Sequence, residues 1–264
     1  MQTNEQLKSI VKEKYGDIAR QSSQGCGCGC DCSDDFSFFN DVYAQQTGYY
    51  AEADLGLGCG IPTQHAQIKE GDIVLDLGSG AGNDVFVARS LVGDSGKVIG
   101  VDMTHEMIEK ARQNQAKLSY QNVEFRFGDI EDLPVADNEV DVIVSNCVLN
   151  LVPDKAKAFK EMYRVLKPGG HFCVSDIVLN GELPERLKSI AEMYAGCVTG
   201  AIQENDYLQM LQAEGFVGVV VKEDRKIVLS DEVLEKYLTC EEIETYRNAS
   251  SHIDSITVYG KKPL

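Results

Sequence analysis

The sequence predicts an α/β fold, with a Rossmann-like, mostly parallel sheet and helices on both of its faces. From residue 72 onward, short β-branched runs alternate with helical segments, which is typical of parallel strands joined by crossover helices. One apolar run also leads directly into three alternating glycines and then a helix, as in nucleotide-binding sheets. A chain of 264 residues with 43% hydrophobic content can bury one such core and carry appendages.

Residues 1–65 are predicted to form a helix followed by a cysteine-rich loop. Apolar residues recur at steps of three and four in the first twenty positions, so we expect an amphipathic helix that packs against the main domain; they are Leu7, Ile10, Val11, Tyr15 and Ile18. Residues 21–35 are rich in Gly, Ser and Cys and lack apolar periodicity, which predicts a loop that carries thiols.

Residues 66–180 are predicted to form the cofactor-binding core. We expect strands at residues 73–77, 97–102, 123–127, 140–145 and 171–175, and helices at 83–91 and 106–116. A turn is expected at 166–170, because proline stops a helix and paired glycines tolerate positive φ. In residues 181–264 we expect helices at 185–194 and 206–214, and apolar runs at 217–221 and 256–259 could complete the sheet beside the acceptor site.

The charge balance narrows the classes of partner. With 42 acidic and 25 basic residues the chain has a formal net charge of -17, which would repel nucleic acid and anionic membrane surfaces. No stretch resembles a signal peptide or a membrane span, so we expect a cytoplasmic protein. There the nine cysteines would be reduced, and their spacing indicates ligand or redox chemistry before a disulfide framework.

The strongest motif is the glycine loop after the first predicted strand, which reads Leu-Asp-Leu-Gly-Ser-Gly-Ala-Gly from residue 75. Glycine lets the backbone turn sharply and approach a ligand without a Cβ in the way. The second strand ends at Asp102, whose carboxylate is placed to accept hydrogen bonds from a ribose. Asp129-Ile130 and Asn146 follow the third and fourth strands, so all four elements converge at the carboxyl ends of the strands.

A dinucleotide-binding protein is the nearest competitor, but here the pattern is G-x-G-x-G preceded by Asp76. Over about residues 72–176 this order resembles the class I S-adenosylmethionine-dependent methyltransferases. The resemblance implies that the glycine loop passes the methionine moiety, that Asp102 holds the ribose hydroxyls and that Asp129 and Ile130 flank the adenine. The predicted cofactor residues are Asp76, Gly78, Gly80, Gly82, Asp102, Met103, Asp129, Ile130 and Asn146.

Three cysteines distinguish the chain from a generic methyltransferase. Cys59 lies in a glycine-rich loop, Cys147 just past the fourth predicted strand, and Cys197 beyond the fifth. The segments Gly-Leu-Gly-Cys-Gly and Ser-Asn-Cys-Val, within residues 55–201, closely resemble the arsenite methyltransferase family. The resemblance implies that Cys147 and Cys197 hold As(III), while Cys59 supplies a third thiolate or takes part in redox exchange.

By the same resemblance, the enzyme would move a methyl group from S-adenosylmethionine to thiolate-bound As(III) in arsenic detoxification. A thiol reductant such as thioredoxin or glutathione would support turnover. Soft thiolates suit a thiophilic centre, and sulfur-bound arsenic keeps a lone pair that can attack the sulfonium methyl in line. Such a nucleophile carries no proton, so catalysis would rest on positioning rather than on a general base.

The run of four alternate cysteines from Cys26 to Cys32 departs from that family, whose members usually carry one or two cysteines here. We favour Cys30 or Cys32 for the family's remaining thiol. The run could equally capture As(III) and hand it inward, bind zinc or another thiophilic ion, or form a disulfide with Cys59.

Other side chains that could bind a metal or take part in catalysis have a simpler structural explanation. Cys173 is expected to pack within a strand, and Cys240 to have no functional role. Glu131 and Asp132 are expected to be solvated loop charges rather than acid-base groups.

Two other functions remain open at this point. The same scaffold could methylate a small organic acceptor such as a quinone precursor, which would leave Cys59, Cys147 and Cys197 without a shared purpose. The cysteine loop could instead belong to a protein that binds or senses thiophilic metals, although an intact cofactor motif argues against that.

Overall fold

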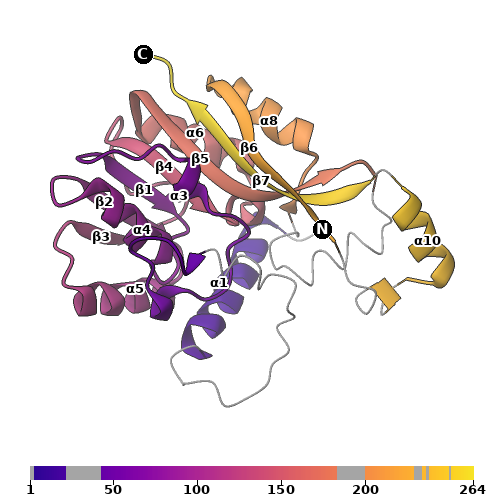
Figure 1. Ribbon diagram of the computed structural model, residues 1–264, viewed down its shortest axis with the longest axis horizontal. Helices are drawn as coiled ribbons and strands as arrows, with labels where there is room; N and C mark the ends of the chain where they lie inside the picture. The colour runs from indigo at the N-terminus through magenta and orange to yellow at the C-terminus, as the bar shows by residue number, and fades with distance from the viewer. Residues whose placement is uncertain (1–2, 22–42, 183–199, 229–233, 236–237, 250) are drawn as a thin grey trace.

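The computed structural model describes residues 3–21, 43–182, 200–228, 234–235, 238–249 and 251–264. These residues form a seven-stranded sheet in the order β3-β2-β1-β4-β5-β7-β6 (Figure 1). Strands β1 to β5 pair in parallel, whereas β7 is antiparallel to both β5 and β6. The predicted Rossmann-like, mostly parallel sheet is therefore confirmed. The strands are β1 Ile73–Leu77, β2 Lys97–Asp102, β3 Val123–Phe127, β4 Val140–Asn146, β5 Leu166–Asn180, β6 Val217–Ile227 and β7 His252–Lys261.

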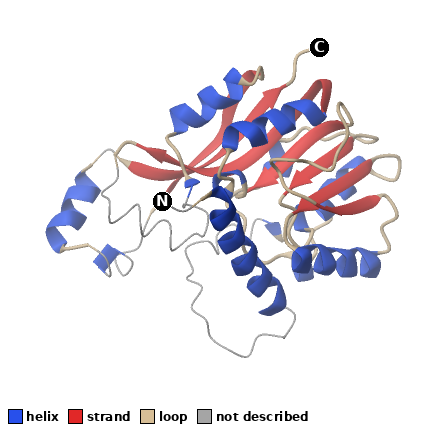
Figure 2. Ribbon diagram, turned by 180° about the vertical axis from the view of Figure 1, so that it is seen from behind, coloured by secondary structure: helices blue, strands red, loops and turns tan. Residues whose placement is uncertain are grey.

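Helices cover both faces of the sheet (Figure 2). Leu75 and Leu77 of β1 belong to a buried cluster with residues of α6 and α8, whereas Val74 belongs to a second cluster with residues of α4 and α5. Side chains alternate in this way along a strand that is covered on both faces. The helices are α1 Asn4–Gln21, α3 Pro62–His65, α4 Asn83–Val92, α5 His105–Leu118, α6 Lys155–Val165, α8 Glu204–Ala213 and α10 Cys240–Asn248, with short 3-10 helices η2 Ala51–Ala53 and η3 Leu149–Leu151.

The N-terminal helix α1 packs against α5 and reaches the loop after β3. The Lys8 ammonium forms ion pairs with the carboxylates of Asp129, at 2.7 Å, and Glu131, at 2.8 Å. Near the other end of α1, Ala19 is buried and Arg20 pairs with Glu106 of α5. The predicted helix and its packing against the main domain are confirmed.

The predicted turn at residues 166–170 was wrong, because this segment already belongs to β5. Leu166 pairs with Val140, and the register between β4 and β5 then shifts before Val142. Backbone hydrogen bonds join Gly169 and Gly170 to Lys262, just past β7. The segment therefore bends while it stays in the sheet.

The C-terminal elements agree with the prediction where the structure describes them. The apolar runs at 217–221 and 256–259 lie in β6 and β7 and complete the sheet, and the helix expected at 206–214 is α8. The helix expected at 185–194 and residues 22–35 of the cysteine loop lie outside the described residues. No helix among the described residues has the length and apolar character needed to cross a membrane.

Candidate functional site

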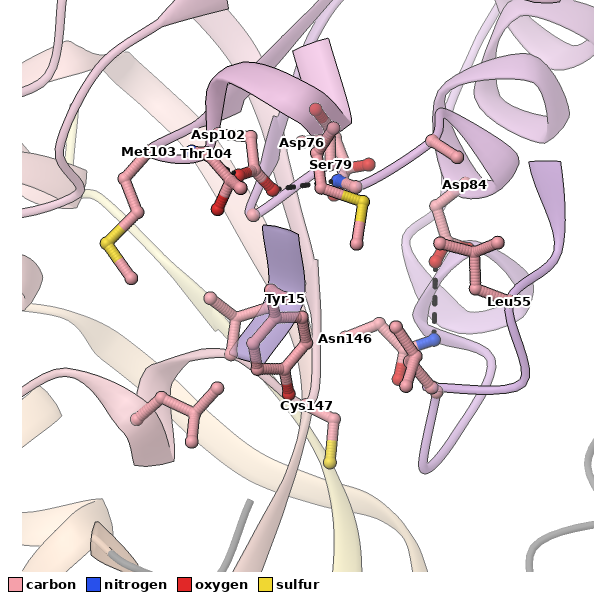
Figure 3. A pocket seen from close by; sticks show the side chains of 18 of the residues that line it. Tyr15, Leu55, Asp76, Ser79, Asp84, Asp102, Met103, Thr104, Asn146 and Cys147 are labelled. Carbon is pink, nitrogen blue, oxygen red and sulfur yellow. Dashed lines mark hydrogen bonds between the residues drawn. The ribbon is translucent and has the colours of Figure 1, made fainter. Parts of the chain in front are cut away.

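A pocket opens at the carboxyl ends of β1, β2 and β4, where the strand order reverses between β1 and β4. Open α/β sheets bind their ligands at such a point. Figure 3 shows Asp102 and Met103 on one side of this pocket and Cys147 on another. The sequence-predicted residues that line it are Asp76, Gly78, Gly80, Asp102, Met103, Asp129, Ile130, Asn146 and Cys147.

Asp102, at the end of β2, is held by two backbone groups. The Gly80 N–H donates to Oδ2 at 3.0 Å, and the Thr104 N–H donates to Oδ1 at 2.8 Å (Figure 3). Burial raises the pKa of Asp102, and these hydrogen bonds oppose the rise because they stabilise the charged form. Each carboxylate oxygen has further acceptor capacity, which a ligand hydroxyl can use.

Two glycines of the loop after β1 differ in their surroundings. A Cβ at Gly80 would meet nothing within 4 Å, so open pocket space lies beside its backbone. Gly82 caps α4 with a φ of 101°, and a Cβ there would lie 2.9 Å from the Phe125 ring of β3. Gly82 does not line the pocket. The structure thus gives Gly82 a packing role, and its contact with a cofactor stays a prediction.

Three carboxyl groups of the pocket have raised pKa values. Burial and the charges of Asp84 and Asp102 raise the pKa of Asp76 well above its usual range. Burial also raises the pKa of Asp84 to about 6, although Tyr43 and Asn146 donate hydrogen bonds to it. Acids from β1, β2 and α4 therefore gather where a positively charged group would stabilise their ionised forms. A ligand with an ammonium or sulfonium group fits this pocket.

Two buried polar atoms of the pocket lining lack a hydrogen-bond partner among the described residues: Oγ of Ser79 and Oδ1 of Asn83. Buried polar groups are nearly always hydrogen-bonded, so these atoms indicate a polar ligand. With the open space at Gly80 and the neighbouring acids, they fit S-adenosylmethionine, which carries hydroxyl, amino and charged groups. The prediction missed Ser79, Asn83 and Asp84, although Ser79 lies within the glycine motif and the other two directly follow it.

The loop after β3 forms another wall of the pocket, together with α1. Burial by itself would raise the pKa of Asp129, but Lys8 and the Glu131 N–H hydrogen-bond to this carboxylate and bring its pKa below the usual value. Glu131 is buried, pairs with Lys8 and accepts the Asp154 N–H, so the expectation of a solvated charge was wrong. Asp132 is exposed. The sequence did not predict that Lys8 and Tyr15 of α1 line this pocket.

Cys147 directly follows β4 and lines the pocket with a side chain that is 4% exposed. Its backbone has a φ of 60°, and its N–H donates to the Ser175 carbonyl at 2.8 Å. Cys59 is fully buried and does not line the pocket, but it belongs to the same buried cluster as Cys147. The Cys59 N–H donates to Oδ1 of Asn146, 87 residues away in sequence, at 3.0 Å. The fold therefore gathers two of the predicted thiols at one end of the sheet.

The remaining cysteines divide into two groups. Cys26, Cys28, Cys30, Cys32 and Cys197 lie outside the described residues. Cys173 is buried in β5, and burial raises the pKa of its thiol to about 12, whereas Cys240 is exposed at the start of α10. Among the described residues, no group of three or more His, Cys, Asp or Glu side chains could hold a metal ion.

Comparisons with known proteins give the same picture as the pocket. Residues 68–215 match a family model described as a methyltransferase domain. The arsenite methyltransferase of Halobacterium salinarum is 41% identical over 274 aligned residues, which cover 98% of this chain and 67% of that protein. The arsenite methyltransferase of Homo sapiens is 37% identical over 190 residues, which cover 69% of this chain and 50% of that protein.

A solved structure extends this likeness to the fold. The crystal structure of an arsenic (III) S-adenosylmethionine methyltransferase from Chlamydomonas reinhardtii matches with a TM-score of 0.67 and 32% identity, over 90% of this chain and 75% of that one. This chain spans about two thirds of the Halobacterium relative and about half of the human one. Because the identity to the Halobacterium protein extends over nearly the whole chain, the chain belongs to the arsenite methyltransferase family.

Proposed function

We propose that this protein transfers a methyl group from S-adenosylmethionine to As(III) held by cysteine thiolates. The observation that carries the proposal is the placement of Cys147 in the cofactor pocket, with Cys59 in the same buried cluster. Two buried thiols of one cluster, one of which lines the pocket, have a shared purpose if they bind the same soft atom. If the acceptor were a small organic molecule, a thiol at Cys59 would have no role in binding it.

The cofactor supplies a methyl group on a positively charged sulfur. In this proposal Asp102 would hold the ribose hydroxyls, Asp129 and Ile130 would flank the adenine, and the acids Asp76 and Asp84 would offset positive charge; all five line the pocket. Cys147 would hold arsenic with its lone pair aimed at the methyl carbon. The new As–C bond takes that lone pair, and the electron pair of the broken C–S bond stays on the sulfur, which becomes neutral. The rate then depends on alignment, since no proton moves in this step.

Formation of the As–C bond in this way oxidises arsenic from the trivalent to the pentavalent state. Return to the trivalent state needs two electrons, and we propose a thiol reductant, thioredoxin or glutathione, as their source. The cytoplasm is the compartment we propose, because it keeps thiols reduced. Cys30 or Cys32, outside the described residues, stays the predicted remaining thiol of the family.

Cys197 lies outside the described residues and stays, together with Cys147, a proposed ligand of As(III). Cys59 would supply a third thiolate or take part in redox exchange.

Product analysis tests the proposal directly. We expect monomethylated and more highly methylated arsenic after incubation of the wild type with arsenite, S-adenosylmethionine and reduced glutathione. Cys147→Ser should abolish the product while the affinity for S-adenosylmethionine is retained, whereas Cys240→Ser, at an exposed site, should leave the product unchanged. Arsenite binding without any methylated product would instead favour a metal-binding or sensing protein, and full activity of Cys147→Ser would contradict the ligand assignment.

A further inference from the structure

The Asn146 side chain is hydrogen-bonded to three other parts of the chain. Its Oδ1 accepts the N–H groups of Cys59 at 3.0 Å and Gly60 at 3.3 Å. Its Nδ2 lies within donating distance of the Gly60 carbonyl at 2.9 Å, the Tyr43 hydroxyl at 2.7 Å and Oδ2 of Asp84 at 3.2 Å. Figure 3 shows Asn146 beside Asp84, with Cys147 adjacent. Both the oxygen and the nitrogen of this amide are thus hydrogen-bonded to other protein groups.

The loop that carries Cys59 approaches the strand ends so closely that its glycines have no room for a side chain. A Cβ at Gly58 would lie 2.7 Å from Nδ2 of Asn146. A Cβ at Gly60 would lie 2.5 Å from Oγ of Ser175 in β5. The Gly-Cys-Gly sequence is therefore explained by contact with Asn146 and Ser175, and Cys59 is fixed between these two contacts.

Cys147 is fixed by the same two residues. It follows Asn146 in the chain, and its N–H donates to the Ser175 carbonyl at 2.8 Å. The backbone of Cys59 is thus held by the Asn146 amide and by the Ser255 hydroxyl, which donates to the Cys59 carbonyl, whereas Cys147 is held by the Ser175 carbonyl. Loss of the Asn146 amide would remove one of the two bonds at Cys59 and leave the bond between Cys147 and β5 in place.

We propose that Asn146 is a positioning residue that sets the separation between the Sγ atoms of Cys59 and Cys147, and so the affinity of the thiol pair for As(III). The inference rests on the proposed function, because it concerns the same arsenic site. Binding of one atom by two thiols gains its strength from the second thiol being already in place. Loss of the Asn146 bonds removes that advantage without removing either sulfur.

A double-mutant cycle in arsenite binding tests this role, with purified protein, arsenite alone as the ligand and no cofactor present. We expect Cys59→Ser to weaken arsenite binding about 100-fold and Asn146→Ala about tenfold or more. The double variant should bind no more weakly than Cys59→Ser alone, because Asn146 acts only through Cys59. Additive losses in the double variant would overturn the inference and leave the proposed function intact.

If Cys59→Ser leaves arsenite affinity unchanged, Cys59 is not an arsenic ligand, and this result is distinct from one that contradicts only the role of Asn146. Asn122→Ala is the matched control, because Asn122 also bonds two loop carbonyls, of Gly93 and Gly96, and accepts from Arg89, but at the other end of the strands. It should lower the melting temperature to a similar extent and keep arsenite affinity; an equal loss of affinity would reduce Asn146 to a merely structural role.

Gly58→Ala provides a second variant should Asn146→Ala fail to fold. The three heavy atoms nearest to its added methyl group all belong to the Asn146 amide, so we expect it to displace the loop while every polar group is kept. We expect arsenite affinity to fall by about tenfold, again with no further loss when Cys59→Ser is added. Wild-type arsenite affinity in Gly58→Ala would contradict the positioning role.

Discussion

Gly80 and Gly82 stand two positions apart in the loop after β1, yet each excludes a side chain for a different physical reason. Open pocket space lies beside the Gly80 backbone, whereas the Phe125 ring fills the space beside Gly82. A methyl group at Gly80 would occupy pocket space that a ligand can fill. One at Gly82 would force α4 away from β3 and strain a φ of 101°.

Alanine substitutions at these glycines should separate cofactor binding from folding. We expect Gly82→Ala to lower the free energy of unfolding by about 2–3 kcal/mol. Gly80→Ala should cost only about 1 kcal/mol of stability, but weaken S-adenosylmethionine binding about tenfold or more. Urea unfolding and calorimetric titration measure the two quantities, and an unchanged cofactor affinity in Gly80→Ala would contradict our placement of the ligand.

Asp102→Ala should weaken S-adenosylmethionine binding about ten- to a hundred-fold, because a hydrogen bond to a charged acceptor contributes about 1.5–3 kcal/mol. Calorimetric titration gives the affinity. Asp94→Ala is the control, since the Asp94 side chain is 94% exposed and lies away from the pocket. The assignment of Asp102 to the ribose is refuted if the two variants bind the cofactor equally well.

At the scale of elements, α1 is anchored in part by the half-buried cation of Lys8. The Lys8 side chain is 12% exposed and that of its partner Glu131 is 7% exposed, so removal of the ammonium leaves a buried carboxylate without its counter-charge. We expect Lys8→Ala to cost about 2–4 kcal/mol, whereas Lys14→Ala, at an exposed position of the same helix, should change stability by less than about 0.5 kcal/mol. Urea unfolding together with hydrogen exchange in α1 checks both, and equal effects would show that Lys8 does not anchor the helix.

The sequence predicted those elements whose pattern is local. Strands β1, β2 and β3 have the expected bounds, because short apolar runs between glycine-rich and polar segments define them. The full length of β5 was not predictable in this way, since its last residues are ordered by antiparallel pairing with β7 across ten positions. Pairing between distant segments leaves little trace in the strand's own sequence.

The candidate site was predictable to the extent that its residues lie within the strand-end motifs. Asp76, Asp102 and Asn146 lie at or next to the last residue of a strand, Asp129 follows a strand, and all four line the pocket. Lys8 and Tyr43 come from the N-terminal segment, and only the tertiary packing of that segment brings them there. The sequence indicated that Asn146 would face the pocket, but it could not show that its amide bonds to the Cys59 loop.

For the whole molecule, folding gathers several acids in a chain whose net charge is already -17. Asp84 has an ordinary pKa of 3.8 and a pKa of about 6 in the folded protein. The folded state therefore binds more protons than the unfolded state between these values, and stability from this group is present below about pH 4 and lost as pH rises through 6.

Asp84→Asn should remove this pH dependence. Relative to the wild type, the variant should gain about 1–3 kcal/mol of unfolding free energy between pH 4 and pH 7, because it has no buried charge to form. Urea unfolding at several pH values without cofactor provides the measurement. Parallel stability curves for the two proteins would show that Asp84 titrates as it does in the unfolded chain.

The left-handed backbone at Cys147 has a consequence for protein engineering. Neighbouring side chains of an extended strand point to opposite faces, yet Asn146 and Cys147 both line the pocket, because a φ of 60° breaks the alternation. A designer who grafts this thiol onto another parallel sheet must therefore transplant the backbone reversal together with the cysteine. On a regular strand, the same Asn-Cys dipeptide would place the sulfur on the face of the sheet opposite to that of the asparagine.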